Sequence, residues 1–329
     1  MTFFRPSRRS ATTALMLSAA ALAMAAPLAR AQDYPAKPIT LVVPFAAGSG
    51  TDQSARVYGQ AVSDDMKVPV VVDNKGGASG FIAAQYVAKA PPDGYTVFIT
   101  TNTTQVANPY LFKTVPYDPV KDFTPIALLA KGQMLLLVRP DAPYKTLADL
   151  LAAAKKTPGK LNFGSGSSSS QVAGELLKQM AGVNITNVPY KSNPQAITDL
   201  IGGQFDFMFA DAPTAVPQVQ GGKLRALATS GAKRLAAAPE VPTVAEAGVK
   251  GYDMSYWFAI YGPAGMPPAV VKRLNAAFGK ASASAEVKAF QAKTSGEVAF
   301  GTPEELAQFQ AADMKKWERV IRAAGIEPQ

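Results

Sequence analysis

Short apolar runs alternate with amphipathic stretches along most of the chain. The runs are rich in β-branched and aromatic residues, which is typical of strands, and they lie at 39–45, 68–72, 95–100, 205–209 and 224–229. The stretches between them have the apolar spacing of helices, as at 52–66, 81–90 and 171–181. Strands that alternate with helices predict an α/β fold with largely parallel sheets.

Capping residues mark where several helices begin. Thr302-Pro303-Glu304-Glu305 has the form of a capping box and predicts a helix that runs towards Ala324. Thr146, with Asp149 three residues later, predicts a second helix. Asn193-Pro194 predicts the start of a third, shorter one.

Two longer apolar segments predict how the chain divides into domains. The first is Ile126–Arg139, interrupted at Lys131-Gly132-Gln133, and it has the character of a strand that crosses between two domains. Ser255–Tyr261 has the character of the return crossing. We therefore expect one discontinuous domain at 32–131 plus 254–329 and a second at 132–253.

The first 31 residues have the pattern of an export signal. A basic start is followed by an Ala/Leu-rich stretch and by Ala29-Arg30-Ala31, so residues 1–31 are predicted to be a signal peptide cleaved near Ala31. The residues after Arg8-Arg9 match the twin-arginine pattern poorly, which favours the general secretory route. No other apolar stretch reaches the roughly 18 residues of a spanning helix, so an exported protein is expected.

Charge and composition exclude several classes of function. Without the signal, 29 basic residues face 24 acidic ones, a formal charge of +5, which suits small anions and is too weak and scattered for nucleic acid. The chain has no Cys and no His. A disulfide framework is therefore excluded, and the commonest metal ligand and general base are missing. We expect no metal, no cofactor and no catalytic residue.

Two loops rich in glycine and serine each follow a strand and precede a helix. The first is Pro44–Asp52 and the second is Gly164–Ser170. The first N–H groups of a helix have no acceptor within it, and the helix dipole favours negative charge there, so such turns bind anions. In open α/β sheets ligands bind beyond the carboxyl ends of the strands, where both loops lie. The pair predicts a two-sided anion site.

Each loop also has a purely structural interpretation. The first can be a plain tight turn in which Asp52 complements the helix dipole. In the second, Ser168 or Ser169 is expected to cap the helix at 171–181, which leaves Ser165 and Ser167 for ligand contact.

Nucleotide binding and serine catalysis fit these loops poorly. A dinucleotide motif needs glycine where Gln53 and Ser169 stand, and no P-loop occurs. A catalytic triad lacks His, and there is no G-x-S-x-G elbow. A Ser–Lys pair with Lys191 stays open.

Four other residues have two interpretations each. Asp211 lies where a strand gives way to a helix, so it caps that helix or accepts from a ligand donor. Tyr190 either reaches the cleft or ends a surface strand. Trp257 and Phe258 are expected in the core rather than against a ligand.

Many ordered segments resemble the periplasmic solute-binding proteins of tripartite tricarboxylate transporters, the Bug family. They span almost the whole mature chain and include Pro44–Asp52, Val72–Gly80, Pro92–Tyr95, Asn108–Leu111, Leu161–Leu176, Val188–Lys191, Gly222–Ala228, Val241–Gly248 and Pro263–Gly265. The resemblance implies a two-domain periplasmic-binding-protein fold (Venus flytrap, type II) with two crossing strands. It also implies that a carboxylate, such as a dicarboxylate, a tricarboxylate or an aromatic acid, is bound between the domains.

The resemblance further implies the site and the partners. The two loops correspond to the carboxylate-binding elements, and 101–104 and 210–212 to two more cleft loops. The expected ligand-binding residues are Phe45, Ala47, Gly48, Ser49, Thr51, Asp52, Thr101, Thr103, Ser165, Gly166, Ser167, Ser168, Ser169, Tyr190 and Asp211. A monomeric receptor that serves membrane permease subunits is expected. The alternative is a carboxylate sensor that docks on a signalling partner.

The chain differs from the family pattern at Ser49, Gln171 and Ser192, where glycine, histidine and glycine are usual. Because the site then has no imidazole, we expect the affinity for a carboxylate to change little between about pH 6 and pH 8. Calorimetric titration across this range tests the expectation, and a large change in affinity would refute it.

Overall fold

A computed structural model describes residues 34–329, so the expected signal peptide lies outside the described residues. Residues 37–329 form one compact unit, which contains every element named below. The chain before residue 37 is a separate unit, of which 34–36 are described. None of the helices within residues 34–329 has the length and apolar character needed to cross a membrane.

The first lobe is built on a sheet with the strand order β2-β1-β3-β9-β4. β1 runs parallel to β2 and β3, whereas β9 is antiparallel to both β3 and β4. The strands are β1 (Ile39–Val43), β2 (Val70–Asn74), β3 (Thr96–Thr101), β4 (Phe123–Val138), β9 (Ser255–Pro263) and β10 (Glu297–Val298), which pairs with β4.

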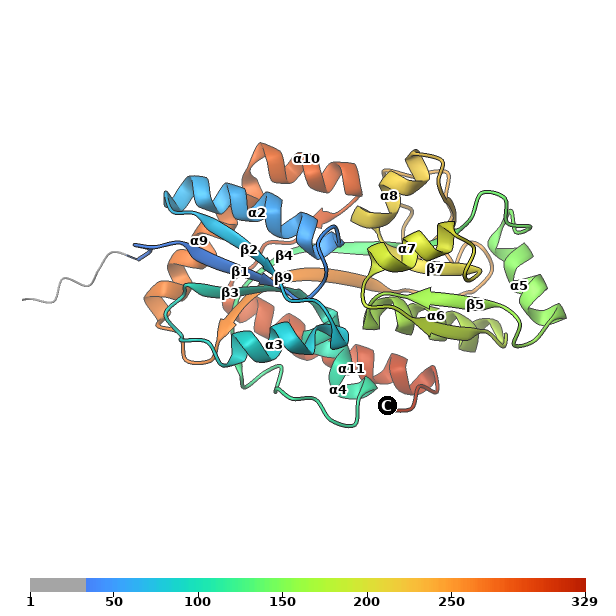
Figure 1. Cartoon of the computed structure of the whole chain (residues 1–329), viewed down its shortest axis with the longest axis horizontal. Helices are drawn as coiled ribbons and strands as arrows, with labels where there is room; N and C mark the ends of the chain where they lie inside the picture. Colours follow the sequence, from blue (N-terminus) through green and yellow to red (C-terminus); the bar gives the residue numbers. More distant parts are fainter. Residues whose placement is uncertain (1–33) are drawn as a thin grey trace, which may run out of the picture. The chain divides into compact units, whose positions relative to one another are not determined.

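Helices cover both faces of this sheet, with α2 and α10 above it and α3 and α11 below it in Figure 1. The helices of the first lobe are α2 (Gly50–Met66), α3 (Phe81–Ala88), α4 (Asn108–Leu111), α9 (Pro268–Ala283), α10 (Ala285–Thr294) and α11 (Pro303–Ala323). Two short turns, η1 (Ala78–Gly80) and the π-helical η2 (Thr103–Ala107), complete it.

The second lobe repeats this arrangement on a sheet of order β4-β7-β5-β6, with β8 also paired to β4. β5 (Asn162–Ser165) is parallel to β6 (Thr186–Pro189) and β7 (Phe207–Asp211), and β8 is Arg225–Thr229. The helices are α5 (Leu147–Lys156), α6 (Ser168–Ala181), α7 (Asn193–Ile201) and α8 (Ala212–Gln220). α7 and α8 lie on the opposite side of the sheet from α6 (Figure 1).

The 16-residue strand β4 belongs to both sheets. Its stretch from Phe123 to Gln133 pairs with β9, and Met134–Val138 pairs with β7. The residues 131–133 that interrupt the apolar run lie within the strand, as the prediction of one crossing strand requires. Gly132 serves close packing, since a Cβ there would lie 2.4 Å from the phenolic oxygen of Tyr256.

The α/β prediction is confirmed, but the sheets are less parallel than expected. Within each lobe, β1–β3 and β5–β7 are parallel, while the shared β4 and its partner β9 run antiparallel to their neighbours. Predicted element ends shift by a few residues: the second strand is 70–74 instead of 68–72, and β4 begins at 123 instead of 126.

The predicted capping boxes are confirmed at two helices. The Thr302 hydroxyl accepts from the Glu305 N–H at 3.2 Å, and the Glu305 carboxylate accepts from the Thr302 N–H at 2.7 Å. Thr146 and Asp149 make the same reciprocal pair at α5. Each pair satisfies two N–H groups that lack a partner within the helix, which fixes where the helix begins.

An ion-pair cluster joins α2 to α9. Asp65 accepts from Lys280 at 2.6 Å and from Arg273 at 3.0 Å. The Lys280 ammonium, together with Arg273, lowers the pKa of the Asp65 carboxyl against the opposing effect of burial. The stability that this shift contributes is present above the ordinary carboxyl pKa and is lost as the pH falls through the lowered value.

We predict that Asp65→Asn lowers the free energy of unfolding by about 1 kcal/mol near neutral pH, because both cations keep exposed surface and are screened. Urea denaturation measures the difference, which shrinks on acidification. Asp64→Asn is the matched control, since the neighbouring Asp64 carboxylate accepts from the exposed Gln60 amide. Equal losses in the two variants would contradict the assignment.

Candidate functional site

The two loops face each other across a cleft between the lobes. Loop residues from both lobes line it, together with residues of β3, β4, β7 and β9. The free space within it is about 30 Å³, which corresponds to roughly one water molecule. The walls are therefore almost in contact.

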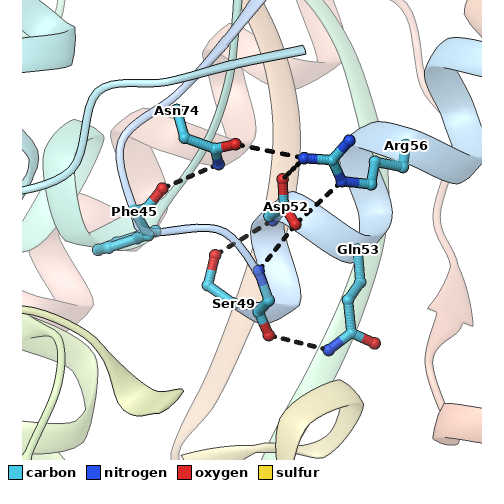
Figure 2. A network of polar contacts seen from close by, with 7 residues as sticks. Phe45, Ser49, Asp52, Gln53, Arg56 and Asn74 are labelled. Atoms are coloured by element: carbon cyan, nitrogen blue, oxygen red, sulfur yellow. Dashed lines mark hydrogen bonds and ion pairs between the residues drawn. The ribbon is translucent and has the colours of Figure 1, made fainter. Parts of the chain in front are cut away.

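The first loop is held by its own side chains, as Figure 2 shows. The Asp52 carboxylate accepts from the Gly48 N–H at 2.9 Å and pairs with Arg56 at 2.9 Å. The Ser49 hydroxyl accepts from the Asp52 N–H at 3.2 Å and so caps α2. The Asn74 amide donates to the Phe45 carbonyl at 3.0 Å. These contacts fix the conformation of the loop through its own residues and their neighbours in the first lobe.

The contacts of the Asp52 carboxylate described above are therefore all with residues of its own lobe. Burial raises the pKa of its carboxyl, but Arg56, the Gly48 N–H and Asn74 together lower it, and the net shift is downward. The carboxylate stays charged and complements the positive end of α2, which was the structural interpretation of this residue. The supporting roles of Arg56 and Asn74 were not predicted from the sequence.

Two N–H groups of α2 remain for a ligand. Ser49 is the N-cap, and its hydroxyl satisfies the third N–H of the helix. Gly50 and Thr51 occupy the first two helical positions, whose N–H groups have no acceptor within a helix. Both residues line the cleft, so the positive end of α2 opens onto it.

The second loop caps its helix differently from the prediction. Ser167 is the N-cap of α6, not Ser168 or Ser169, and it exchanges hydrogen bonds with Ser170 at 3.0 and 3.2 Å. The helix thus begins at Ser168, three residues before the predicted start at Gln171. A capping box is usually recognised in a sequence by Glu or Gln three residues after the N-cap. Here serine occupies both positions, so the sequence did not indicate the capping box. Ser167 consequently has a structural role that the sequence did not reveal.

The hydroxyls of the next two serines link the two lobes. Ser168 donates to the Asn108 side-chain oxygen at 2.8 Å, and Ser169 shares a 3.2 Å hydrogen bond with Thr103. Ser168 and Ser169 are also the first two residues of α6, so their N–H groups have no acceptor within the helix. The α6 terminus therefore matches the α2 terminus on the opposite wall.

Asp211 lies at the end of β7 and at the start of α8. One carboxylate oxygen accepts from the Asn193 amide. The other, Oδ2, is buried and makes no hydrogen bond to any residue within 34–329. A Cβ on Gly50, in the other lobe, would lie 2.0 Å from this oxygen, so glycine at 50 permits the close approach.

Burial raises the pKa of the Asp211 carboxyl above its ordinary value, and the Asn193 amide opposes the shift. The stability linked to this group is complete below the ordinary carboxyl pKa and is lost as the pH rises through the raised value. The expectation that affinity changes little between about pH 6 and pH 8 considered only the missing imidazole. Asp211 is a second kind of titratable group in the cleft, and that expectation did not include it.

The remaining expected ligand residues divide into two groups. Phe45, Thr101, Thr103 and Gly166 line the cleft with the residues already described. Ala47 and Gly48 are exposed on the first loop, and Ser165 is buried in β5. The Tyr190 ring packs on Phe205 at a centroid distance of 5.4 Å, beside the core of the second lobe.

Met134, Asn193, Tyr256 and Phe258 also line the cleft, and the sequence analysis did not assign them to it. Tyr256 and Phe258 alternate with Trp257, which is buried and donates to Asp313 at 2.8 Å. Side chains alternate between the faces of a strand, so Phe258 lines the cleft and Trp257 lies in the core. The core position expected for Trp257 is confirmed, whereas Phe258 is buried as expected but also lines the cleft, and the alternation was the signal that identifies it and Tyr256.

A two-lobed α/β structure whose crossing strands flank an anion-compatible cleft is the architecture of a solute-binding receptor. The family model of the tripartite tricarboxylate transporter family receptor matches residues 54–326. Protein BugT of Bordetella pertussis is 34% identical over 308 residues, which cover 92% of this chain and 94% of BugT. The chain therefore belongs to the family of tripartite tricarboxylate transporter receptors, which includes the Bug proteins.

Solved structures agree with this assignment. The Rpa4515 protein of R. palustris with adipate superposes with a TM-score of 0.88 at 36% identity, covering 90% of this chain and all of that one. MatC from Rhodopseudomonas palustris with bound malate has a TM-score of 0.83 at 33% identity, covering 88% of this chain and all of MatC. The periplasmic binding protein BugD has a TM-score of 0.86 at 32% identity, with coverages of 90% and 100%. The expected periplasmic-binding-protein fold is confirmed.

We predict that Gly50→Ala weakens carboxylate binding about tenfold or more, because the added methyl group meets the Asp211 carboxyl when the walls are in contact. Overpacking of this kind costs about 1–3 kcal/mol, and it is relieved when the lobes separate. Calorimetry measures the affinity, and urea denaturation is expected to show little loss of stability.

Gly59→Ala is the matched control, since it makes the same change in α2 but faces Val70 and Leu41 within the first lobe. It is expected to leave the affinity unchanged. Wild-type affinity in Gly50→Ala would contradict the proposed contact of the walls.

Proposed function

We propose that this protein is a periplasmic receptor that binds a small carboxylate in the cleft and delivers it to membrane permease subunits. The observation that carries the proposal is the pair of facing helix N-termini. Gly50 and Thr51, the first two residues of α2, line one wall, and Ser169, the second residue of α6, lines the opposite wall; the N–H groups at these positions have no acceptor within the helix. The relatives with adipate and malate bound support a dicarboxylate as the ligand class.

Closure of the lobes explains how backbone N–H groups at the helix N-termini hold an anion without a cationic side chain. Exclusion of water lowers the local dielectric constant and strengthens each hydrogen bond to the carboxylate. The two domains proposed for this motion are 32–131 plus 254–329 and 132–253, joined through β4 and β9. Small rotations within the crossing strands then separate or join the walls.

We also propose that the protein is a monomer and has no catalytic activity. The Ser167 and Ser170 hydroxyls hydrogen-bond each other, and Lys191 is exposed outside the cleft lining. A Ser–Lys pair therefore receives no support within the described residues.

Native mass spectrometry of freshly purified mature protein is expected to show a co-purified acid, and thermal shift with mono-, di- and tricarboxylates identifies its class. A ligand at about one hundred times its Kd stabilises the protein by about 2.7 kcal/mol and raises Tm by several degrees. The neutral diamide of the best acid is the control and is expected to give no shift. Equal shifts with acid and diamide, or chemical conversion of the bound acid, would overturn the proposal.

A further inference from the structure

Asp211 and Asn193 place two unsatisfied oxygen atoms in the cleft. The Asn193 amide nitrogen donates to one Asp211 oxygen, which leaves Asp211 Oδ2 and Asn193 Oδ1 as buried acceptors with no donor among residues 34–329. Both residues line the cleft, and Asn193 is only 7% exposed. A buried acceptor without a donor costs about 1–3 kcal/mol, so this arrangement favours a ligand that supplies the donor.

The charges around the cleft further favour a ligand that supplies a hydrogen-bond donor. Its lining, within the described residues, contains no Lys or Arg, and Arg56 is directed to Asp52. Tyr256 is the other titratable side chain in the lining, and burial with the nearby Asp211 charge raises the pKa of its phenol well above the usual value. No described Lys or Arg in the lining therefore balances Asp211, and the ionised Asp211 carboxylate would present a like charge to a plain dianion on that wall.

Other acceptors near the site have partners of their own. Asp52 Oδ2 accepts from Gly48 and Arg56, Asp52 Oδ1 makes no hydrogen bond within the described residues but is ion-paired with Arg56 at 2.9 Å, and the Asn108 oxygen accepts from Ser168. The helix N-termini supply donors for the ligand carboxylates. Asp211 and Asn193 thus differ in kind from the rest of the site, since they offer acceptors where the other elements offer donors.

We propose that Asp211 and Asn193 form an acceptor subsite that selects carboxylates carrying a hydrogen-bond donor, either a hydroxyl or an ammonium group, on the carbon chain. The inference rests on the proposed function and narrows its substrate class. The carboxylates of the ligand bind at the helix N-termini, and the donor group satisfies Asp211 Oδ2. An ammonium group also balances the buried charge, so it is preferred over a hydroxyl.

The test uses nine acids as probes: unbranched dicarboxylates of four, five and six carbons, each unsubstituted, with a 2-hydroxyl group and with a 2-amino group. Calorimetry near pH 7.5 gives their affinities for the wild type, for Asp211→Asn and for Asp141→Asn. Asp141 is an exposed carboxylate of the second lobe paired with Arg139, so its variant removes the same charge away from the cleft.

For at least one chain length, the wild type is expected to bind the substituted acids about tenfold to a hundredfold more tightly than the unsubstituted one, the range for a hydrogen bond to a charged group. In Asp211→Asn the amino preference disappears, and the unsubstituted acid binds more tightly because a like charge is gone. A variant that is merely misfolded weakens all nine acids together. Asp141→Asn keeps the wild-type order.

Two results overturn the inference in different ways. If the wild type binds unsubstituted and substituted acids equally, or Asp211→Asn keeps the preference, the acceptor subsite is wrong while the carboxylate receptor stands. If the folded wild type binds none of the nine acids, the proposed function fails for dicarboxylates, and the inference fails with it.

Discussion

The hydrogen-bonded ladder along β4 is the constraint on which the arrangement of this protein depends. One strand pairs with β9 in the first sheet and with β7 in the second, so the two sheets are joined by continuous backbone and not by a flexible linker. The positions of Asp211 and Tyr256 follow from this ladder, because Met134 pairs with Asp211 and Gly132 with Tyr256. The same ladder therefore positions both lobes and the polar groups between them.

The hydrogen-bond donors that the helix termini leave unused at the cleft are backbone N–H groups more than side chains. The hydroxyls of Ser49 and Ser167 are used to cap α2 and α6, and Asp52 is used to hold its own loop. What remains for a ligand is the first pair of N–H groups on each helix. This explains how a chain without histidine, and a cleft lined by no described Lys or Arg, retains an anion-binding geometry.

The sequence predicted the features that depend on local pattern. The α/β order, the capping boxes at Thr302 and Thr146 and the core position of Trp257 follow from spacing along a single element. It did not reveal Asn193, because the residue begins a helix and its side chain meets Asp211 only through the pairing of distant strands. The N-cap role of Ser167 was not predicted, because four consecutive serines offer several equivalent caps, and Ser167 still lines the cleft as expected. Features that depend on tertiary contacts are beyond the reach of local pattern.

The hydrogen bond from Ser168 to Asn108 and the one shared by Ser169 and Thr103 link residues of the two lobes. Each stabilises the arrangement in which the lobes are joined by about 0.5–1.5 kcal/mol. Part of the apparent affinity then reflects the fraction of molecules already closed, since an apparent Kd equals the intrinsic Kd divided by the competent fraction. Because Asn108 lies outside the cleft lining, variation there changes the affinity for every ligand equally, and the selectivity and the strength of binding can evolve separately.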